Sequence, residues 1–138
     1  MIIADTGFWV ALANPNDQYR ALALRTFAAL REPLITTWPV MTEVCHLLLK
    51  RRGIESQLKF IQLYRRGGFK VFPLEDCHAP RIHELTRTYA DLPMDLADAS
   101  LVILAEYLNH GRILSTDCRD FHAYRWKNTR PFTNLLLT

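Results

Sequence analysis

The residue types in this chain that could do chemistry are carboxylates, and one of them stands in an unusual place. Asp98 lies in the stretch Asp91–Glu106, where apolar residues such as Leu101 and Ala105 recur at helical spacing. Because Asp98 shares their stripe, it is expected to project toward the interior of the protein. A carboxylate in that position is costly unless it is paired, protonated or bound to a cation.

The same stretch also allows a purely structural interpretation. Asp95 can be the N-cap of the helix, and Asp98 can be an acidic residue of the first turn that the helix dipole stabilises. Pro93 fits just before that turn or within it, because its missing N–H costs little there. This stretch alone leaves both interpretations open, so the other acids of the chain must decide.

Three further acids interrupt apolar elements at their inward edge. Asp5 ends the apolar run Ile2–Ala4, Glu43 leans toward the apolar side of its helix, and Asp117 follows a second apolar run. Each of them could instead be a helix-end acid that favours the helix dipole. Clustered carboxylates repel one another, and such oxygen ligands suit a hard divalent cation such as Mg²⁺ or Mn²⁺. Taken together, the four acids predict a metal-binding site.

The elements that must position these acids alternate between strand and helix. The predicted strands cover Ile2–Ala4, Leu34–Thr37, Phe69–Phe72 and Arg112–Thr116, with Pro131–Thr133 as a fifth, edge strand. The predicted helical segments cover residues 8–12, 18–30, 39–52, 54–64 and 80–89, then the helix of Asp98, and a short helix or turn over 117–124. This alternation predicts an α/β sandwich with a largely parallel sheet.

Ligands of such sheets bind outside the carboxyl ends of the strands. Asp5 and Asp117 stand at the carboxyl ends of the first and fourth predicted strands. If the strand order reverses direction between these two strands, both acids face one crevice.

Composition is typical of one domain spanning residues 1–138, because 138 residues with 49% apolar content can bury a sizeable core. No apolar run approaches the ~20 residues of a membrane span, and the N-terminus lacks the pattern of a signal peptide. The three cysteines are odd in number and far apart, which favours reduced thiols in the cytoplasm. A net charge of +3 is compatible with nucleic acid but does not demand it.

Four short segments carry the acids along the chain. They are Asp5-Thr6-x-x-Trp9, Thr42-Glu43-Val44, Asp95-Leu-Ala-Asp98-Ala99 and Leu114-Ser-Thr-Asp117-x-x-Asp120-Phe121. Each is short, but their joint order and spacing resemble the acidic motifs of PIN-domain ribonucleases, most closely those of the VapC-type toxins of toxin–antitoxin pairs. The resemblance covers nearly the whole chain.

This resemblance implies a fold, an activity and partners. The fold would be a PIN-like three-layer sandwich with a mostly parallel five-stranded sheet in the order 3-2-1-4-5 and helices on both faces. The activity would be Mg²⁺-dependent hydrolysis of RNA by a toxin that forms homodimers, with no membrane association. A small cognate antitoxin would bind with its tail over the acidic pocket.

The resemblance also implies roles for individual residues. Asp5 and Asp98 would bind Mg²⁺, with Mn²⁺ as the alternative ion, while Glu43 and Asp117 would complete the acidic pocket. Thr6 and Thr116 would support the carboxylates by hydrogen bonds. Asp120 competes with Asp117 for the fourth acidic position, and Asp117 is preferred because Asp120 can be an ordinary helix acid.

Basic residues are needed around such a pocket, because four carboxylates would repel RNA. Arg51 and Arg52 end one predicted helix, and Arg119 lies two residues from Asp117. These arginines are the predicted RNA contacts. The structural alternative is that they are solvated residues at helix ends, where cations favour the dipole.

Two other functions remain open. A Mg²⁺-binding receiver domain of a signalling protein has a similar alternation of strands and helices, but it usually needs paired acids after the first strand and a phosphorylatable Asp after the third. Here the first strand ends in the single Asp5 and the third in Phe72-Pro73. A catalytically inactive module that binds RNA or protein is the second alternative, and the full set of acids argues against it.

Overall fold

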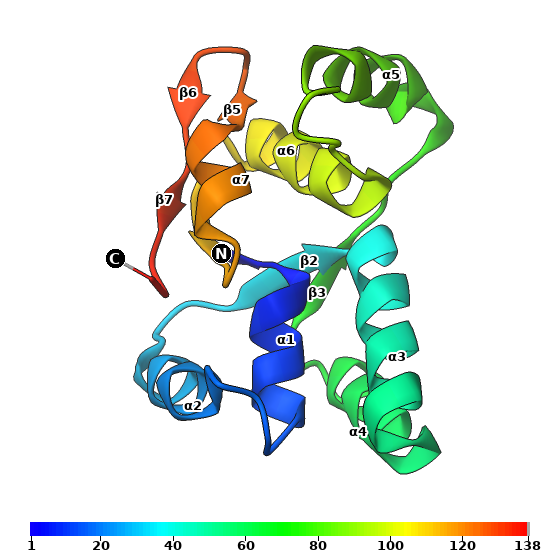
Figure 1. Cartoon of the computed structure of the whole chain (residues 1–138), viewed down its shortest axis with the longest axis vertical. Helices are drawn as coiled ribbons and strands as arrows, with labels where there is room; N and C mark the ends of the chain where they lie inside the picture. The colour runs from blue at the N-terminus through cyan, green and yellow to red at the C-terminus, as the bar shows by residue number, and fades with distance from the viewer. Residues whose placement is uncertain (138) are drawn as a thin grey trace.

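Short runs of apolar and β-branched residues form the strands of the protein, whose computed structural model describes residues 1–137 (Figure 1). The strands are β1 (Ile2–Ala4), β2 (Leu34–Thr37), β3 (Lys70–Phe72), β4 (Arg112–Leu114), β5 (Arg125–Trp126), β6 (Arg130–Pro131) and β7 (Thr133–Asn134). Five of them form one sheet in the order β3-β2-β1-β4-β7, and all neighbouring pairs in it are parallel.

The helices follow the strands, as a parallel sheet requires. They are α1 (Thr6–Ala13), α2 (Arg20–Ala29), α3 (Trp38–Arg52), α4 (Ile54–Arg65), the 3₁₀ helix η1 (Asp76–His78), α5 (Ala79–Thr88), α6 (Leu96–Leu108) and α7 (Cys118–Ala123). In Figure 1, α5 and α6 lie on one side of the sheet, and α1 to α4 lie on the other.

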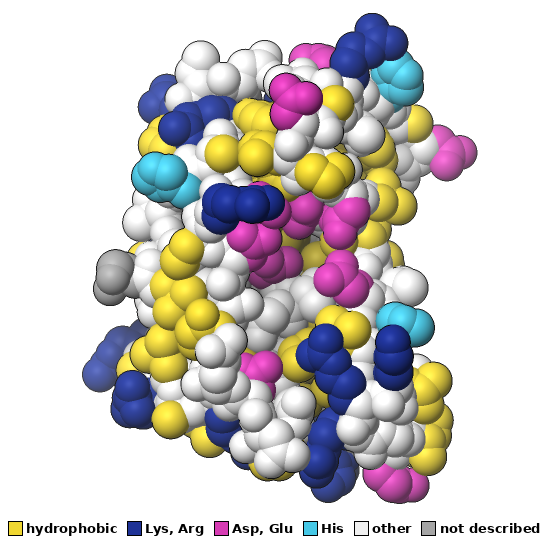
Figure 2. All heavy atoms as spheres, viewed as in Figure 1, with side chains coloured by type: hydrophobic (Ala, Val, Ile, Leu, Met, Phe, Trp, Pro, Cys, Tyr) yellow, Lys and Arg dark blue, Asp and Glu magenta, His cyan; other side chains and the backbone are white. Residues whose placement is uncertain are grey.

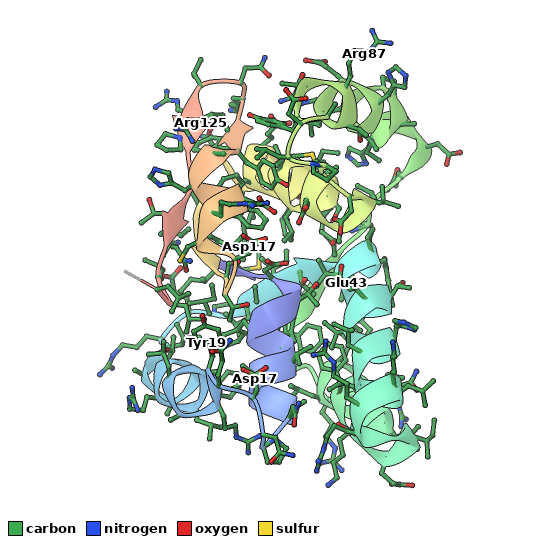
Figure 3. The ribbon with its side chains drawn as sticks, in the orientation of Figure 1. Asp17, Tyr19, Glu43, Arg87, Asp117 and Arg125 are labelled. Carbon is green, nitrogen blue, oxygen red and sulfur yellow. The ribbon has the colours of Figure 1, made fainter. Side chains whose placement is uncertain are left out.

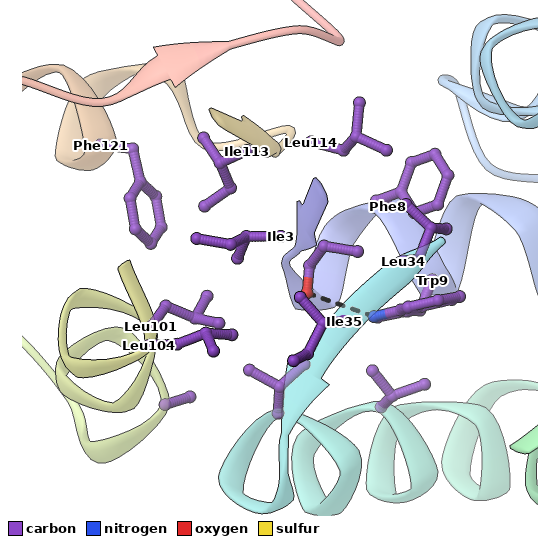
Figure 4. Packing of buried hydrophobic residues seen from close by; sticks show 14 of the residues in the cluster. Ile3, Phe8, Trp9, Leu34, Ile35, Leu101, Leu104, Ile113, Leu114 and Phe121 are labelled. Atoms are coloured by element: carbon purple, nitrogen blue, oxygen red, sulfur yellow. Dashed lines mark hydrogen bonds between the residues drawn. The ribbon is translucent and has the colours of Figure 1, made fainter. Parts of the chain in front are cut away.

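Alternation along the strands sends successive side chains into two different halves of the core. Figure 4 shows Ile3 and Ile113 directed toward Leu101 and Leu104 of α6. On the opposite face, Trp9 of α1 packs in the core and its indole Nε1 donates a hydrogen bond to the carbonyl of Ala4 at 3.3 Å. Because both faces of the sheet are covered, β1 and β2 are buried along their whole length.

The expected sheet order is confirmed, with one difference at its edge. The fifth sheet strand is β7 at Thr133–Asn134 rather than Pro131–Thr133, and an antiparallel hairpin of β5 and β6 precedes it. The hairpin turns through Lys127 and Asn128, which both have positive φ. The sheet order also excludes the receiver topology, in which strand 3 neighbours strand 1, because here β3 lies at the edge of the sheet beside β2, and β1 lies between β2 and β4.

Among residues 1–137, no helix combines the length and the apolar character needed to cross a bilayer.

Candidate active site

Asp5 lies where β1 ends and α1 begins, and it is the most buried acid of the site. One carboxylate oxygen, Oδ1, accepts a hydrogen bond from the backbone N–H of Thr6 at 2.7 Å. The other, Oδ2, accepts from the hydroxyl of Ser115 at 3.0 Å. Burial raises the pKa of Asp5 to about 7, the two hydrogen bonds oppose that rise, and the charges of Glu43 and Asp117 add to it.

Ser115 is a supporting residue that the sequence did not single out. Its buried hydroxyl donates to Asp5 and accepts a hydrogen bond from the backbone N–H of Asp117 at 2.9 Å. It thereby joins the carboxyl ends of β1 and β4. Thr116, to which this support had been assigned, packs instead against the backbone of Gly7, where an added Cβ would overlap its hydroxyl.

Asp98 combines the two interpretations that its sequence allowed. Asp95 is the N-cap of α6 and accepts from the backbone N–H of Asp98 at 2.8 Å, while the carboxylate of Asp98 reaches back to the N–H of Asp95 at 3.4 Å. Burial, followed by the charges of Asp95 and Asp5, raises the pKa of Asp98 to about 7. One residue of the capping box at the start of α6 is therefore also an acid of the site.

Tyr124 supplies the remaining hydrogen bond to Asp98. Its hydroxyl donates to Oδ2 of Asp98 at 3.0 Å. Burial and the charge of Asp98 raise the pKa of Tyr124 well above its usual range, so the phenol keeps its proton and stays a donor. Tyr124 was not recognised in the sequence, although a buried tyrosine hydroxyl usually requires a partner.

Asp117 caps α7 and accepts from the backbone N–H of Asp120 at 3.0 Å. Burial raises its pKa, and the neighbouring carboxyl of Asp120 adds to the rise. Asp120 itself pairs with the largely exposed Arg119 at 3.3 Å. The Ser115 hydroxyl links Asp5 to the backbone of Asp117, and the charge of Asp117 adds to the rise in the pKa of Asp5, so Asp117 remains the preferred fourth acid.

Glu43 comes from α3, on the opposite side of the site from Asp117 (Figure 3). Burial and the charge of Asp95 raise its pKa, while the nearby Thr6 hydroxyl opposes the rise. That proximity does not amount to a hydrogen bond of ordinary geometry, since Thr6 Oγ1 is buried with no hydrogen-bond partner among residues 1–137. A buried polar atom without a partner beside several acids is consistent with a further polar ligand at this place.

The acids gather in a hollow in the middle of one face of the protein, where Figure 2 shows Asp and Glu side chains together. Within residues 1–137, no three Asp, Glu, His or Cys side chains are close enough to hold one metal ion directly. Mg²⁺ does not require three protein ligands, because it usually keeps several waters and binds through one or two carboxylates. The oxygen donors of Asp5 and Asp98, which repel each other without a cation, fit that requirement.

A groove adjoins the acids between the first turns of α3 and α6. Its volume is about 630 Å³, and apolar residues form most of its wall. Trp38 and Leu96 are about half exposed there, at 48% and 53%. Glu43 and Asp95 line the groove as well, so an apolar surface meets the acidic site directly.

The predicted RNA contacts lie at different distances from the acids. Arg119 is two residues from Asp117, and its side chain is 81% exposed. Arg51 and Arg52 are exposed at the far end of α3. Since Glu43 precedes Arg51 by two turns of the helix, about 12 Å separates them along its axis. Arg119 thus lies beside Asp117 and Asp120, whereas Arg51 and Arg52 lie at the opposite end of α3 from Glu43.

Comparisons with known proteins agree with this architecture. The family model described as PIN domain matches residues 2–127. A curated relative, ribonuclease VapC26 of Mycobacterium tuberculosis, is 26% identical over 127 residues, which cover 90% of this chain and 92% of that protein. The crystal structure of VapC20 of M. tuberculosis, a sarcin–ricin loop cleaving toxin, superimposes with a TM-score of 0.79 at 20% identity, over 85% of this chain and 90% of that one.

Proposed function

Because the chain belongs to the PIN domain family, we propose that it is a Mg²⁺-dependent endoribonuclease and the toxin of a toxin–antitoxin pair. The observation that carries this proposal is the position of Asp5 and Asp117 at the carboxyl ends of β1 and β4, where the Ser115 hydroxyl donates to Asp5 and accepts from the N–H of Asp117. Glu43 and Asp98 lie near enough to these acids for their charges to interact. Asp5 responds to the charges of Glu43 and Asp117, and Asp98 responds to Asp5. The names of the relatives, a ribonuclease and an RNA-cleaving toxin, support the same activity.

The proposed chemistry is hydrolysis of a phosphodiester bond. Asp5 and Asp98 would hold the divalent ion, which lowers the pKa of a bound water and neutralises charge on the phosphate. Ser115 and the Thr6 N–H keep the carboxylate of Asp5 in place. Glu43 and Asp117, with their raised pKa values, would orient the attacking water or accept its proton.

RNA would approach through basic side chains at the margin of the site. Arg119 is the nearest of the three predicted contacts, and its exposed guanidinium is free to exchange Asp120 for a phosphate. Arg51 and Arg52 would bind phosphates farther along the strand. Such contacts position RNA without reading its sequence, so we propose RNA as the substrate class and no specific target.

The groove beside the acids supports the proposed antitoxin. Its apolar wall at Trp38 and Leu96 and its acidic residues Glu43 and Asp95 suit a short segment with aromatic and basic side chains. Such a segment would exclude RNA from the site. Exposed Leu49, Ile54 and Leu58 on α3 and α4 would form part of a homodimer interface.

We further propose that the protein acts in the cytoplasm. Its three cysteines are free, and two of them, Cys77 and Cys118, are exposed. Such thiols persist in a reducing compartment.

The test of the activity compares wild type with Asp98→Asn, which keeps the shape of the side chain and removes its charge. Each protein is incubated with total cellular RNA and with a sarcin–ricin loop oligonucleotide, in Mg²⁺, Mn²⁺ or a chelator. We expect Asp98→Asn to lower cleavage by about 10²-fold or more, because a metal ligand is lost. Calorimetry should find weakened Mn²⁺ binding in the same variant.

Cleavage by Asp98→Asn at the wild-type rate and in the presence of chelator would rule out the proposed mechanism. RNA binding by the wild type with no cleavage at any metal concentration would identify an inactive binding module instead.

A further inference from the structure

Tyr124 stands at the C-cap of α7 and is fully buried, at 0% exposure. Two aromatic neighbours hold its ring by edge contacts: Phe121, with ring centroids 5.2 Å apart at 87°, and Tyr89, at 5.0 Å and 71°. Such edge-to-face pairs fix the plane of a ring. The hydroxyl is therefore held in one direction, and in that direction lies Asp98.

The hydrogen bonds of Asp98 are distributed unevenly between its two oxygens. Oδ2 accepts from the Tyr124 hydroxyl at 3.0 Å and from the Asp95 N–H at 3.4 Å. Oδ1 accepts no hydrogen bond from the part of the chain that the structure describes. The carboxylate is thus tethered by one oxygen, and its other oxygen keeps its lone pairs for another ligand.

The length of the two bonds indicates which one does the tethering. At 3.4 Å the backbone contact is weak, whereas 3.0 Å is within the ordinary range. The Tyr124 hydroxyl is also out of water, so its bond to a carboxylate does not compete with solvent. Without it, the side chain of Asp98 would turn more freely about the first turn of α6.

We propose that Tyr124 is a positioning residue of the active site, which sets the orientation of Asp98 so that its free oxygen is available to the divalent ion. This inference rests on the proposed metal-dependent nuclease function. The Tyr124 hydroxyl bonds to Asp98, and its proposed effect on the metal passes through that carboxylate. Residues that hold a metal ligand in place typically contribute about 10–100-fold to metal affinity or activity.

The matched pair of variants is Tyr124→Phe and Tyr89→Phe. Tyr124→Phe removes the hydroxyl and keeps the ring that packs on Phe121 and Tyr89. Tyr89→Phe removes the hydroxyl of the neighbouring ring, which accepts a hydrogen bond from the backbone N–H of Arg125 at 2.9 Å. Among residues 1–137 this hydroxyl makes no hydrogen bond to Asp98. The two variants therefore disturb the same aromatic cluster, and only the first loses the bond to Asp98.

Each variant is titrated with Mn²⁺ by calorimetry, and RNA cleavage is measured against Mn²⁺ concentration. We expect Tyr124→Phe to weaken Mn²⁺ binding by about 10-fold and to lower kcat by at least as much, with KM for RNA unchanged. Tyr89→Phe should keep both values within about twofold of wild type. In the double variant with Asp98→Asn, Tyr124→Phe should add no further loss, because its effect passes through Asp98.

Wild-type Mn²⁺ binding and cleavage by Tyr124→Phe, beside a clear loss in Asp98→Asn, would overturn this inference and leave the proposed function standing. Equal losses in Tyr124→Phe and Tyr89→Phe would overturn it too, since they would reflect packing. An additive loss in the double variant would also overturn the inference, because the effect of Tyr124→Phe would then not pass through Asp98. This holds even if Tyr124→Phe lowers the stability of the protein. A wild type that neither binds Mn²⁺ nor cleaves RNA would overturn both proposals.

Discussion

Asp5 and Asp98 hold their protons unusually tightly for carboxylic acids. Each has a pKa of about 7 in the folded protein, well above the 3.8 that is usual for an aspartic acid, and burial is the largest cause for both. In the unfolded chain the two groups ionise near their ordinary pKa. The folded protein therefore binds more protons than the unfolded chain between about pH 4 and 7.

The sign of the resulting pH dependence follows from this difference. The stability contribution of a group with a raised pKa is fully present below its unfolded pKa, and it is lost as pH rises through the folded value. We expect the melting temperature of the metal-free protein to fall between pH 5 and 8, measured by thermal denaturation in chelator. Mg²⁺ should restore stability more at pH 8 than at pH 5, because it binds the ionised acids.

Asp98→Asn serves as the reference, because it removes one of the two shifted groups. We expect this variant to have a flatter pH profile and, at pH 8 without metal, a stability about 1–2 kcal/mol above wild type, a value reduced to allow for solvent screening. His110, whose pKa burial lowers, acts in the opposite direction near pH 6 but equally in both proteins. A metal-free wild type as stable at pH 8 as at pH 5, with no difference from the variant, would contradict the raised pKa values.

The acids of the site could be proposed from sequence because each one interrupts an apolar pattern, and patterns of that kind reflect the core. Their supporting hydroxyls could not be identified in this way. Ser115 and Thr116 both follow the last residue of β4, where the alternation of the strand has ended. Sequence alone gives no rule for which of the two hydroxyls turns toward Asp5.

At the level of elements, the first turn of α1 lies against the segment between β4 and α7. Gly7 makes this contact possible, because an added Cβ would overlap Thr116. Rotating the threonine side chain gives little relief, since its Cβ is β-branched and a methyl group would replace the hydroxyl. This segment also carries Ser115 and Asp117, so a displacement of α1 would reach the site.

We therefore expect Gly7→Ala to destabilise the protein by about 1–3 kcal/mol, although alanine is the better helix former. It should also lower RNA cleavage, because Ser115 and Asp117 move with their segment. Thermal denaturation measures the first effect and the cleavage assay the second.

Thr116→Ala in the Gly7→Ala background removes the overlapping hydroxyl and should restore most of the stability. Gly67→Ala is no substitute control, since its positive φ introduces backbone strain of its own. If Gly7→Ala were as stable as wild type, the close packing described for this contact would be incorrect.

Element order was predictable because the four main strands are apolar runs separated by helices. The β5–β6 hairpin was not, since each of its strands has only two residues and its turn contains Lys127 in a left-handed conformation. Lysine rarely adopts a left-handed conformation, so Lys127 does not indicate a turn, whereas asparagine, the residue type of Asn128, adopts it more often. Pro131, the first residue of the predicted last strand, belongs to β6 of the hairpin, so the sheet strand β7 begins two residues later, at Thr133.

At the level of the whole molecule, acidic side chains gather in the hollow and basic side chains lie at helix ends, although the net charge of the chain is only +3. If Arg51 and Arg52 bind phosphates, replacing both by alanine should weaken RNA binding. It should also lower the slope of log affinity against log salt by about 1.4, because each contact to a single strand contributes about 0.7. Filter binding at several salt concentrations measures that slope. Mn²⁺ affinity should stay unchanged.

The control replaces Arg25 and Arg31, two exposed arginines outside the predicted contacts, by alanine. It removes the same net charge, so it separates specific phosphate contacts from a general loss of attraction. Equal salt slopes in both double variants would show that Arg51 and Arg52 make no specific phosphate contacts and are solvated residues at a helix end.

The hydrogen bond between Ser115 and Asp5 joins residues 110 positions apart in the chain. During translation Asp5 is made first and cannot form this bond until Ser115 has been made. Tyr124 is made later still. A growing polypeptide therefore carries Asp5 and Glu43 long before it can assemble the proposed nuclease site. On this basis, the proposed activity could reach the ribosome that makes the protein only after synthesis has passed Tyr124.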